Sequence, residues 1–232
     1  MLVNTRSSNR RSALVALLLL APVPSLGVVA AMVVAPGPVG HVIFVAAKAW
    51  LLIFPAAWYL VVEKGRPSWS PPRRGGLLTG ALSGVVMGAV VVAAAAVAVH
   101  QGLDSAELGA AARGMGLGSA SAFLAGAAAW TFVNSLIEEY VYRWFVFGQC
   151  ERLLGGRAAI WAAAAIFTAH HVIAVSRYLD AGLTILASAG VFTGGVIWSW
   201  LYRRYRSIWP GWISHVVVDA AVFGVGWWLL FA

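Results

Sequence analysis

Seven apolar segments, each long enough to cross a lipid bilayer, constrain this sequence more than any other feature. They are Ala13–Val34, Val39–Val62, Leu77–Val99, Ser119–Phe147, Ala158–Val175, Leu183–Tyr202 and Ile208–Leu230. A helix needs about 20 apolar residues to cross the hydrocarbon core. Each segment must be helical, because lipid offers no hydrogen-bond partner to an unpaired backbone group. The sequence therefore predicts an all-α, polytopic transmembrane helix bundle of about seven spans.

The composition argues against an ordinary soluble domain. Hydrophobic residues make up 61% of the 232 residues, charged residues only 10%, and the mean hydropathy is +0.84. Soluble domains contain about 25% charged residues, and a soluble fold this apolar would expose large hydrophobic patches. Cys150 is the only cysteine, which excludes an internal disulfide and a cysteine-rich metal site.

Local features refine the spans. Proline at positions 22, 24 and 55 should kink the first two helices, and Pro210 fits the first turn of the last one. The segment Asp104–Gly118 is expected to be an outer loop or a helix on the surface. Three arginines before Ala13 resemble the start of a signal peptide. The long apolar run that follows them favours a retained first span.

The basic residues predict the orientation. With the N-terminus inside, the inner side collects twelve of them, which are Arg6, Arg10, Arg11, Lys64, Arg66, Arg73, Arg74, Arg152, Arg157, Arg203, Arg204 and Arg206. The outer side collects Arg113 and Arg177. This positive-inside bias predicts a cytoplasmic N-terminus and an outer C-terminus, and we expect a bacterial plasma membrane. No basic-aromatic groove or zinc-finger spacing is visible, so the expected partner is the bilayer and not nucleic acid.

Ionisable side chains at membrane depth carry the functional signal, because each costs roughly 2.5–3.5 kcal/mol to insert. Within the predicted spans they are His41, Lys48, Glu138, Glu139, Arg143, His170, His171, His215 and Asp219. Counted at 1.5 Å per residue, Glu138, His171 and His215 lie roughly 14, 20 and 10 Å from the inner ends of their spans. Three helices can therefore bring these groups to a similar level.

Helical spacing suggests partners for some of these groups. Glu139 and Arg143 are four residues apart, which allows an ion pair that could serve packing alone. Glu138 is turned by about 100° from Glu139 on an α-helix, so its carboxylate points elsewhere. His215 and Asp219 are also four apart, so the carboxylate can orient the imidazole.

These residues form three motifs in order: EExxxR from Glu138 to Arg143, FxxxH from Phe167 to His171, and HxxxN/D from His215 to Asp219. The pattern resembles the CPBP (ABI) family of intramembrane proteases, which includes the CAAX prenyl endopeptidases, over Trp130–Val222. The first three spans match only as generic hydrophobic helices. We therefore divide the chain into N-terminal spans and loops (1–117) and a catalytic helix bundle (118–232).

The resemblance implies a glutamate-type intramembrane endopeptidase that hydrolyses a membrane-associated or C-terminal peptide. Glu138 and His171 would activate water. Glu139 and Arg143 would hold the base or bind the end of the substrate chain. Phe167 is also expected to bind substrate. Amide hydrolysis needs such a base and a donor for the oxyanion.

The last motif would stabilise the oxyanion, with His215 donating a hydrogen bond to it and Asp219 orienting the His215 ring. Asp219 is not expected to donate directly, because an ionised carboxylate cannot donate as the Asn common in the family does. Of the adjacent histidines, His171 has the FxxxH spacing, and His170 is expected to face a neighbouring helix. Catalysis is expected to need no metal. The alternative is a zinc ion bound by His171, His215 and Glu138, although no HExxH motif is present.

Two other functions remain open. A non-catalytic protein of the same family could use the pocket for peptide binding or bacteriocin self-immunity. A small transporter could use the buried charges as a proton relay, although a relay would not need the motif spacings. The sequence does not identify the substrate or show whether it is lipidated.

Overall fold

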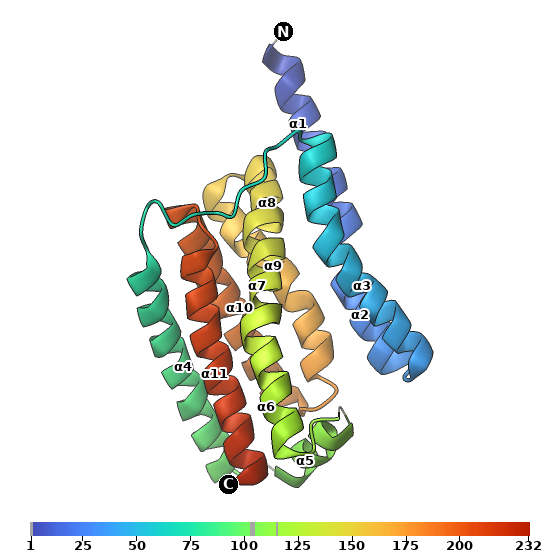
Figure 1. Ribbon diagram of the computed structural model, residues 1–232, viewed down its shortest axis with the longest axis vertical. Helices are drawn as coiled ribbons and strands as arrows, with labels where there is room; N and C mark the ends of the chain where they lie inside the picture. Colours follow the sequence, from blue (N-terminus) through green and yellow to red (C-terminus); the bar gives the residue numbers. More distant parts are fainter. Residues whose placement is uncertain (1, 103–104, 115) are drawn as a thin grey trace.

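The computed structural model describes residues 2–102, 105–114 and 116–232, which form a bundle of long helices (Figure 1). In chain order the helices are α1 (Leu2–Leu20), α2 (Val23–Val29), α3 (Pro38–Ala57), α4 (Leu77–His100), α5 (Ser105–Gly114), α6 (Ala120–Ala128), α7 (Ser135–Glu138), α8 (Phe147–Leu154), α9 (Gly156–Val175), α10 (Ala181–Tyr205) and α11 (Trp209–Phe231). Wider π-helical turns continue some of them at Ala30–Val34, Trp58–Val62, Ala129–Asn134 and Glu139–Val146.

Within the described residues, seven helical segments are long and apolar enough to cross a membrane, so the predicted all-α transmembrane architecture is confirmed. Their bounds are Asn9–Val34, Pro38–Val62, Leu77–His100, Ala120–Leu154, Gly156–Val175, Ala181–Tyr205 and Trp209–Phe231. The fourth differs most from its prediction, because the helix continues past Phe147 to Leu154. The first helix starts at one end of the bundle and the last helix finishes at the other (Figure 1).

The prolines act largely as predicted. The first span is interrupted between α1 and α2 at Ala21 and Pro22, since proline cannot donate a backbone hydrogen bond. Pro55 lies inside α3, and the helix widens into a π-helical turn three residues later. Pro210 lies in the first turn of α11. The expected surface element at 104–118 contains α5, although Asp104 and Met115 are outside the described residues.

A row of glycines brings α4 and α11 into close contact. Gly80, Gly84 and Gly88 are four residues apart and buried on one face of α4. Cβ atoms added at Gly84 and Gly88 would come within 2.8 Å of Ser214 and 3.2 Å of Ala221 on α11. Small residues at this spacing allow membrane helices to approach closely. The sequence pattern did not predict this glycine face, which fixes the position of α11 and of the residues it carries.

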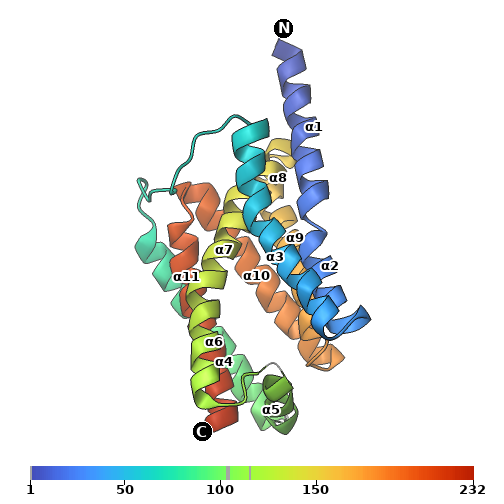
Figure 2. The same ribbon diagram turned by 45° about the vertical axis from the view of Figure 1, so that its right-hand side comes forward.

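The fourth span runs through the middle of the bundle. Its segments α6, α7 and α8 form one continuous rod with α3 on one side and α11 on the other (Figures 1 and 2). The pair α9 and α10 packs behind it (Figure 1). Side chains of the fourth span can therefore contact three other layers of helices.

Candidate active site

The EExxxR motif lies where the fourth span changes its helical form. Glu138 is the last residue of α7, and Glu139 begins the π-helical turn Glu139–Val146. Such wide turns are rare and frequent at functional sites. The apolar pattern predicts an uninterrupted α-helix here, because local periodicity gives no sign of the change to a π-helix.

The predicted ion pair between Glu139 and Arg143 is present and completely buried. Arg143 Nε lies 3.3 Å from Glu139 Oε1, and both side chains have zero exposure. Arg143 Nη1 also donates to Ser199 Oγ at 3.2 Å and to the Gly195 carbonyl at 3.5 Å, both on α10. The ion pair therefore joins the fourth span to α10.

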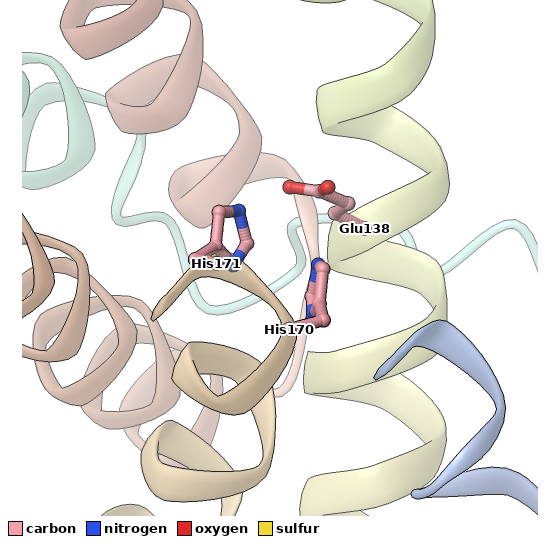
Figure 3. Close-up of side chains that lie close together, drawn as sticks. All are labelled: Glu138, His170 and His171. Atoms are coloured by element: carbon pink, nitrogen blue, oxygen red, sulfur yellow. The ribbon is translucent and has the colours of Figure 1, made fainter. Parts of the chain in front are cut away.

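Glu138 is buried, with 7% of its surface exposed, and its contacts differ from those of Glu139. Figure 3 shows its carboxylate directed toward two imidazoles on α9, those of His170 and His171. One ligand atom from each of these three side chains lies within 4.8 Å of the others. Glu138 Oε1 accepts a hydrogen bond from Asn134 Nδ2 at 2.9 Å, and Oε2 lies 3.7 Å from Nε2 of His215.

The ring of His171 has a defined hydrogen-bonding state. Its Nδ1 lies 2.9 Å from the carbonyl oxygen of Phe167, one helical turn earlier. A carbonyl can only accept, so Nδ1 carries the proton and donates. In the neutral ring Nε2 is then left as an acceptor, which is the state that can take a proton from water.

His170 lies in the same cluster and is therefore closer to Glu138 than predicted. Its Nδ1 lies 3.3 Å from the Tyr142 hydroxyl and its ring stacks on that of Tyr142. The expected contact with a neighbouring helix is therefore present. The same ring nevertheless stays within reach of Glu138, because adjacent residues at the end of α9 both face the fourth span (Figure 3).

His215 joins the two glutamates. Its Nδ1 lies 3.3 Å from Glu139 Oε1, and its Nε2 lies 3.7 Å from both Glu138 Oε2 and Asp219 Oδ1. The close hydrogen bond that orients the ring thus goes to Glu139, and Asp219 makes only the longer charge contact. Trp198 stacks on the imidazole with 3.8 Å between ring centroids and donates from Nε1 to Ser214.

The substrate-binding role predicted for Arg143 and Phe167 has no accessible surface here. Their exposed fractions are 0% and 1%. The Arg143 guanidinium lies 4.6 Å from the ring centre of Phe167, and that ring packs beneath His171 at 4.5 Å. Both side chains are buried beneath the imidazoles, and their role in substrate binding stays a prediction.

The residues that could hold a metal differ from the set predicted. Glu138, His170 and His171 offer donor atoms within 4.8 Å of one another, whereas His215 was expected in place of His170. Tetrahedral zinc with ligands at about 2.0–2.1 Å separates its donors by only about 3.3 Å. The donor types fit zinc, and the separation of at most 4.8 Å is compatible with a shared metal ion.

Several contacts of the site escaped sequence analysis. Asn134 binds Glu138 and is itself bound by Lys48 of the second span, whose Nζ lies 2.9 Å from Asn134 Oδ1. The sequence signal for this contact is Lys48 itself, a charged residue inside the second predicted span. Trp198 and Tyr142, which contact the histidines, gave no signal because aromatic residues are common in membrane helices.

Comparison with known protein families supports the motif assignment. The model of the type II CAAX prenyl endopeptidase Rce1-like family matches residues 120–221. This range nearly coincides with the expected Trp130–Val222 and includes all three motifs. No curated protein and no solved structure matches the chain. The resemblance predicted from the three motifs is therefore confirmed over residues 120–221, and it supports a membrane protease in general.

Proposed function

We propose that the protein is an intramembrane endopeptidase that cleaves near the C-terminus of a membrane-associated peptide, with Glu138 as general base. The observation that carries the proposal is the position of the Glu138 carboxylate, buried between His171 on α9 and His215 on α11. Buried carboxylates at membrane depth are rare and mark functional sites. We further propose that residues 118–232 form the catalytic unit, with residues 1–117 supplying surrounding spans.

The first step activates water. A water molecule between Glu138 Oε2 and His171 Nε2 meets two acceptors, which orient its hydrogens. Its oxygen attacks the scissile carbonyl carbon while one proton passes to Glu138. The carbonyl electron pair moves onto oxygen and forms a tetrahedral oxyanion. A positioned base of this kind contributes typically about 10²–10⁴-fold to the rate.

The second step breaks the carbon–nitrogen bond. The oxyanion re-forms its carbonyl, and the proton held by Glu138 passes to the leaving amine, so the base is regenerated. His215 in its doubly protonated form donates from Nδ1 to Glu139 and keeps an Nε2 donor for the oxyanion. Preorganised donors of this type supply a large part of the rate in acyl transfer.

The buried ion pair has a supporting role in this proposal. Arg143 holds Glu139, and Glu139 holds the His215 ring through the 3.3 Å contact to Nδ1. Phe167 packs against His171 in a tilted arrangement and Trp198 stacks on His215, and both contacts limit the rotation of the imidazoles. The imidazoles are thus oriented before the substrate arrives, which lowers the reorganisation needed in the reaction.

The test compares Glu138→Gln with the unmodified protein in detergent micelles. The probes are two internally quenched peptides that end in a Cys-aliphatic-aliphatic-X sequence, one farnesylated on the cysteine and one not. We expect the substitution to lower kcat by about 10²–10⁴-fold. Glu151→Gln, on the same span but outside the site, is the matched control and should retain full activity.

The outcomes separate the alternatives. Cleavage by Glu138→Gln at the unmodified rate would contradict the catalytic assignment. Tight peptide binding without turnover, unaffected by the substitution, would favour the non-catalytic binding function. Preference for the farnesylated probe would assign the substrate to prenylated proteins.

A metal-dependent variant of the mechanism would use Glu138, His170 and His171 as ligands, and bound zinc would then polarise the carbonyl or the water. Exhaustive chelation distinguishes the two forms. Activity that survives chelation supports the metal-free form, and a loss that only zinc restores supports the other.

A further inference from the structure

Lys48, which lies outside the residues that match the family, is linked to Glu138 through one amide. Its Nζ donates to Asn134 Oδ1 at 2.9 Å, and Asn134 Nδ2 donates to Glu138 Oε1 at 2.9 Å. We infer that Lys48 and Asn134 are positioning residues that fix which oxygen of Glu138 accepts the proton. The inference rests on the proposed function and adds to it a role for the second span.

The chemistry of the three groups determines the direction of both hydrogen bonds. An ammonium group can only donate, so the oxygen of the Asn134 amide must face Lys48. Its amino group must then face Glu138, where Oε1 can only accept. A proton taken up during catalysis is thereby directed to Oε2, the oxygen that lies 3.7 Å from His215.

The surroundings of Lys48 make this contact its main polar interaction. Nζ lies 5.7 Å and 5.9 Å from the ring centres of Phe44 and Trp130. Among the described residues, no carboxylate comes within ion-pair distance of it. A lysine at membrane depth without a carboxylate partner is energetically unfavourable, which indicates a function beyond packing.

The first variant is Asn134→Asp. It keeps an oxygen for Lys48 to bind but removes the N–H that Glu138 accepts. The positioning role predicts that kcat falls about 10- to 100-fold, the range expected for losing a hydrogen bond to a charged group, with KM unchanged. Asn134→Asp also places a second carboxylate beside Glu138, so Lys48→Met separates the two roles. A merely structural role for Lys48 predicts that Lys48→Met lowers thermal stability and leaves kcat unchanged.

Lys48→Met and Lys48→Arg complete the test. Lys48→Met should lower kcat as Asn134→Asp does. Lys48→Arg should keep the kcat of the unmodified protein, because arginine, like lysine, can only donate hydrogen bonds. The matched control is Arg10→Met, which removes another basic contact between the N-terminal spans and the fourth span, the 3.0 Å bond to the Leu153 carbonyl. It should leave kcat unchanged.

The results distinguish this inference from the proposed function. An active Glu138→Gln variant would overturn both. An inactive Glu138→Gln variant together with unchanged kcat in Asn134→Asp and Lys48→Met would overturn the positioning role alone. Thermal unfolding in micelles shows whether each variant is folded, and the KM comparison shows whether the pocket is intact.

A second feature, independent of the catalytic site, is a cavity of about 320 Å³ at the end of the bundle where α10 finishes. Its walls combine the aromatic rings of Trp144, Tyr202 and Tyr205 with three arginines. Arg73 and Arg74 come from the linker between the second and third spans, and Arg206 follows α10.

The arginines of this cavity differ in their charge balance. Arg206 donates to both carboxylate oxygens of Glu151, at 2.6 and 2.8 Å, and these hydrogen bonds raise the pKa of Arg206 above its ordinary value. Its charge is therefore permanent and already compensated. Arg73 and Arg74 form no ion pair with any described residue, so the cavity keeps two positive charges available.

The linker that forms one wall is held in place. Ser207 Oγ donates to the Ser70 carbonyl at 2.7 Å, and the Ile208 amide donates to Ser70 Oγ at 3.1 Å. Trp209 donates to the Trp69 carbonyl at 3.0 Å, and the two indoles pack together. Paired tryptophans are typical of the membrane–water interface.

We propose that this cavity binds the phosphate headgroup of an anionic phospholipid. Basic pockets between membrane helices at the headgroup level are suited to such ligands, and guanidinium groups match phosphate geometry. The interfacial tryptophans favour a lipid over a soluble anion, because they place the cavity at the level of the headgroups.

The test measures lipids that stay bound to the full-length protein after transfer from vesicles of phosphatidylcholine and phosphatidylglycerol into detergent. We expect phosphatidylglycerol to be retained selectively, and Arg73→Gln/Arg74→Gln to weaken retention about 30-fold. The matched control, Lys64→Gln/Arg66→Gln, removes two charges from the same linker but outside the cavity, and should retain the lipid.

Equal retention by the cavity variant and the unmodified protein would overturn the proposal. Displacement of the lipid by millimolar inorganic phosphate would identify a general phosphate site, with the lipid as one source. Displacement by an acidic peptide but not by phosphate would assign the cavity to a peptide and overturn the lipid assignment.

Discussion

Replacement of Arg143 by leucine should destabilise the bundle more than any change of a surface charge. Arg143 Nε lies 3.3 Å from Glu139 Oε1 with neither side chain exposed. At an effective dielectric constant of about 20, two unit charges at this distance attract by about 5 kcal/mol. The leucine also leaves Ser199 and the Gly195 carbonyl without their donor.

The expected loss is about 3–5 kcal/mol in the free energy of unfolding, because the variant strands the Glu139 carboxylate in the bundle core. Unfolding by sodium dodecyl sulfate in mixed micelles, followed by tryptophan fluorescence, measures this quantity. Arg152→Leu is the control. Arg152 pairs with Glu63 at 2.5 Å but is 34% exposed, so its loss should cost at most about 1 kcal/mol.

The double variant Glu139→Leu/Arg143→Leu tests the cause. If the stranded charge destabilises the bundle, removing both partners should recover most of the lost stability. An Arg143→Leu variant within about 1 kcal/mol of the unmodified protein would refute the reasoning. A double variant no more stable than the single one would show that packing, not charge, sets the effect.

Four further outcomes follow from the structure. Gly211→Ala should lower both activity and melting temperature, because its Cβ would collide with the buried carboxylate of the ion pair, whereas Gly224→Ala, with open space around it, should not. Gly80→Ala should lower the free energy of unfolding by about 1–3 kcal/mol, because the added Cβ would overlap the backbone of α11. Gly88→Ala should lower it less, and thermal unfolding measures both. His171→Ala should lower kcat by about 10²–10⁴-fold in the peptide assay, and activity rescued by added imidazole would support its role as an acceptor. Peptide cleavage should survive exhaustive chelation, and a zinc-specific rescue would contradict the metal-free mechanism.

Much of the architecture could be predicted from the chain because membrane insertion is a local property. A run of apolar residues forms a helix wherever it meets lipid, so seven spans and their approximate ends follow from composition along the sequence. Spacing within one helix is equally local. The pair of Glu139 and Arg143 forms as its four-residue separation predicts, even though this part of the span is π-helical.

Contacts between helices depend on rotation and packing, which the linear pattern does not specify. The hydrogen bond of His215 to Glu139 instead of Asp219 is set by the approach of α11, which the glycine face of α4 fixes. Lys48 reaches Asn134 only because the second span lies beside the fourth.

The sequence by itself determined which ionisable residues fall within the apolar spans. It also determined that they form the motifs EExxxR, FxxxH and HxxxN/D in that order. The tertiary structure alone decided that Glu138 faces two histidines of α9 and one of α11, and that Arg143 and Phe167 are sealed beneath them. The physical reason is that burial in lipid acts on each segment separately, whereas a catalytic arrangement exists only once several segments have packed.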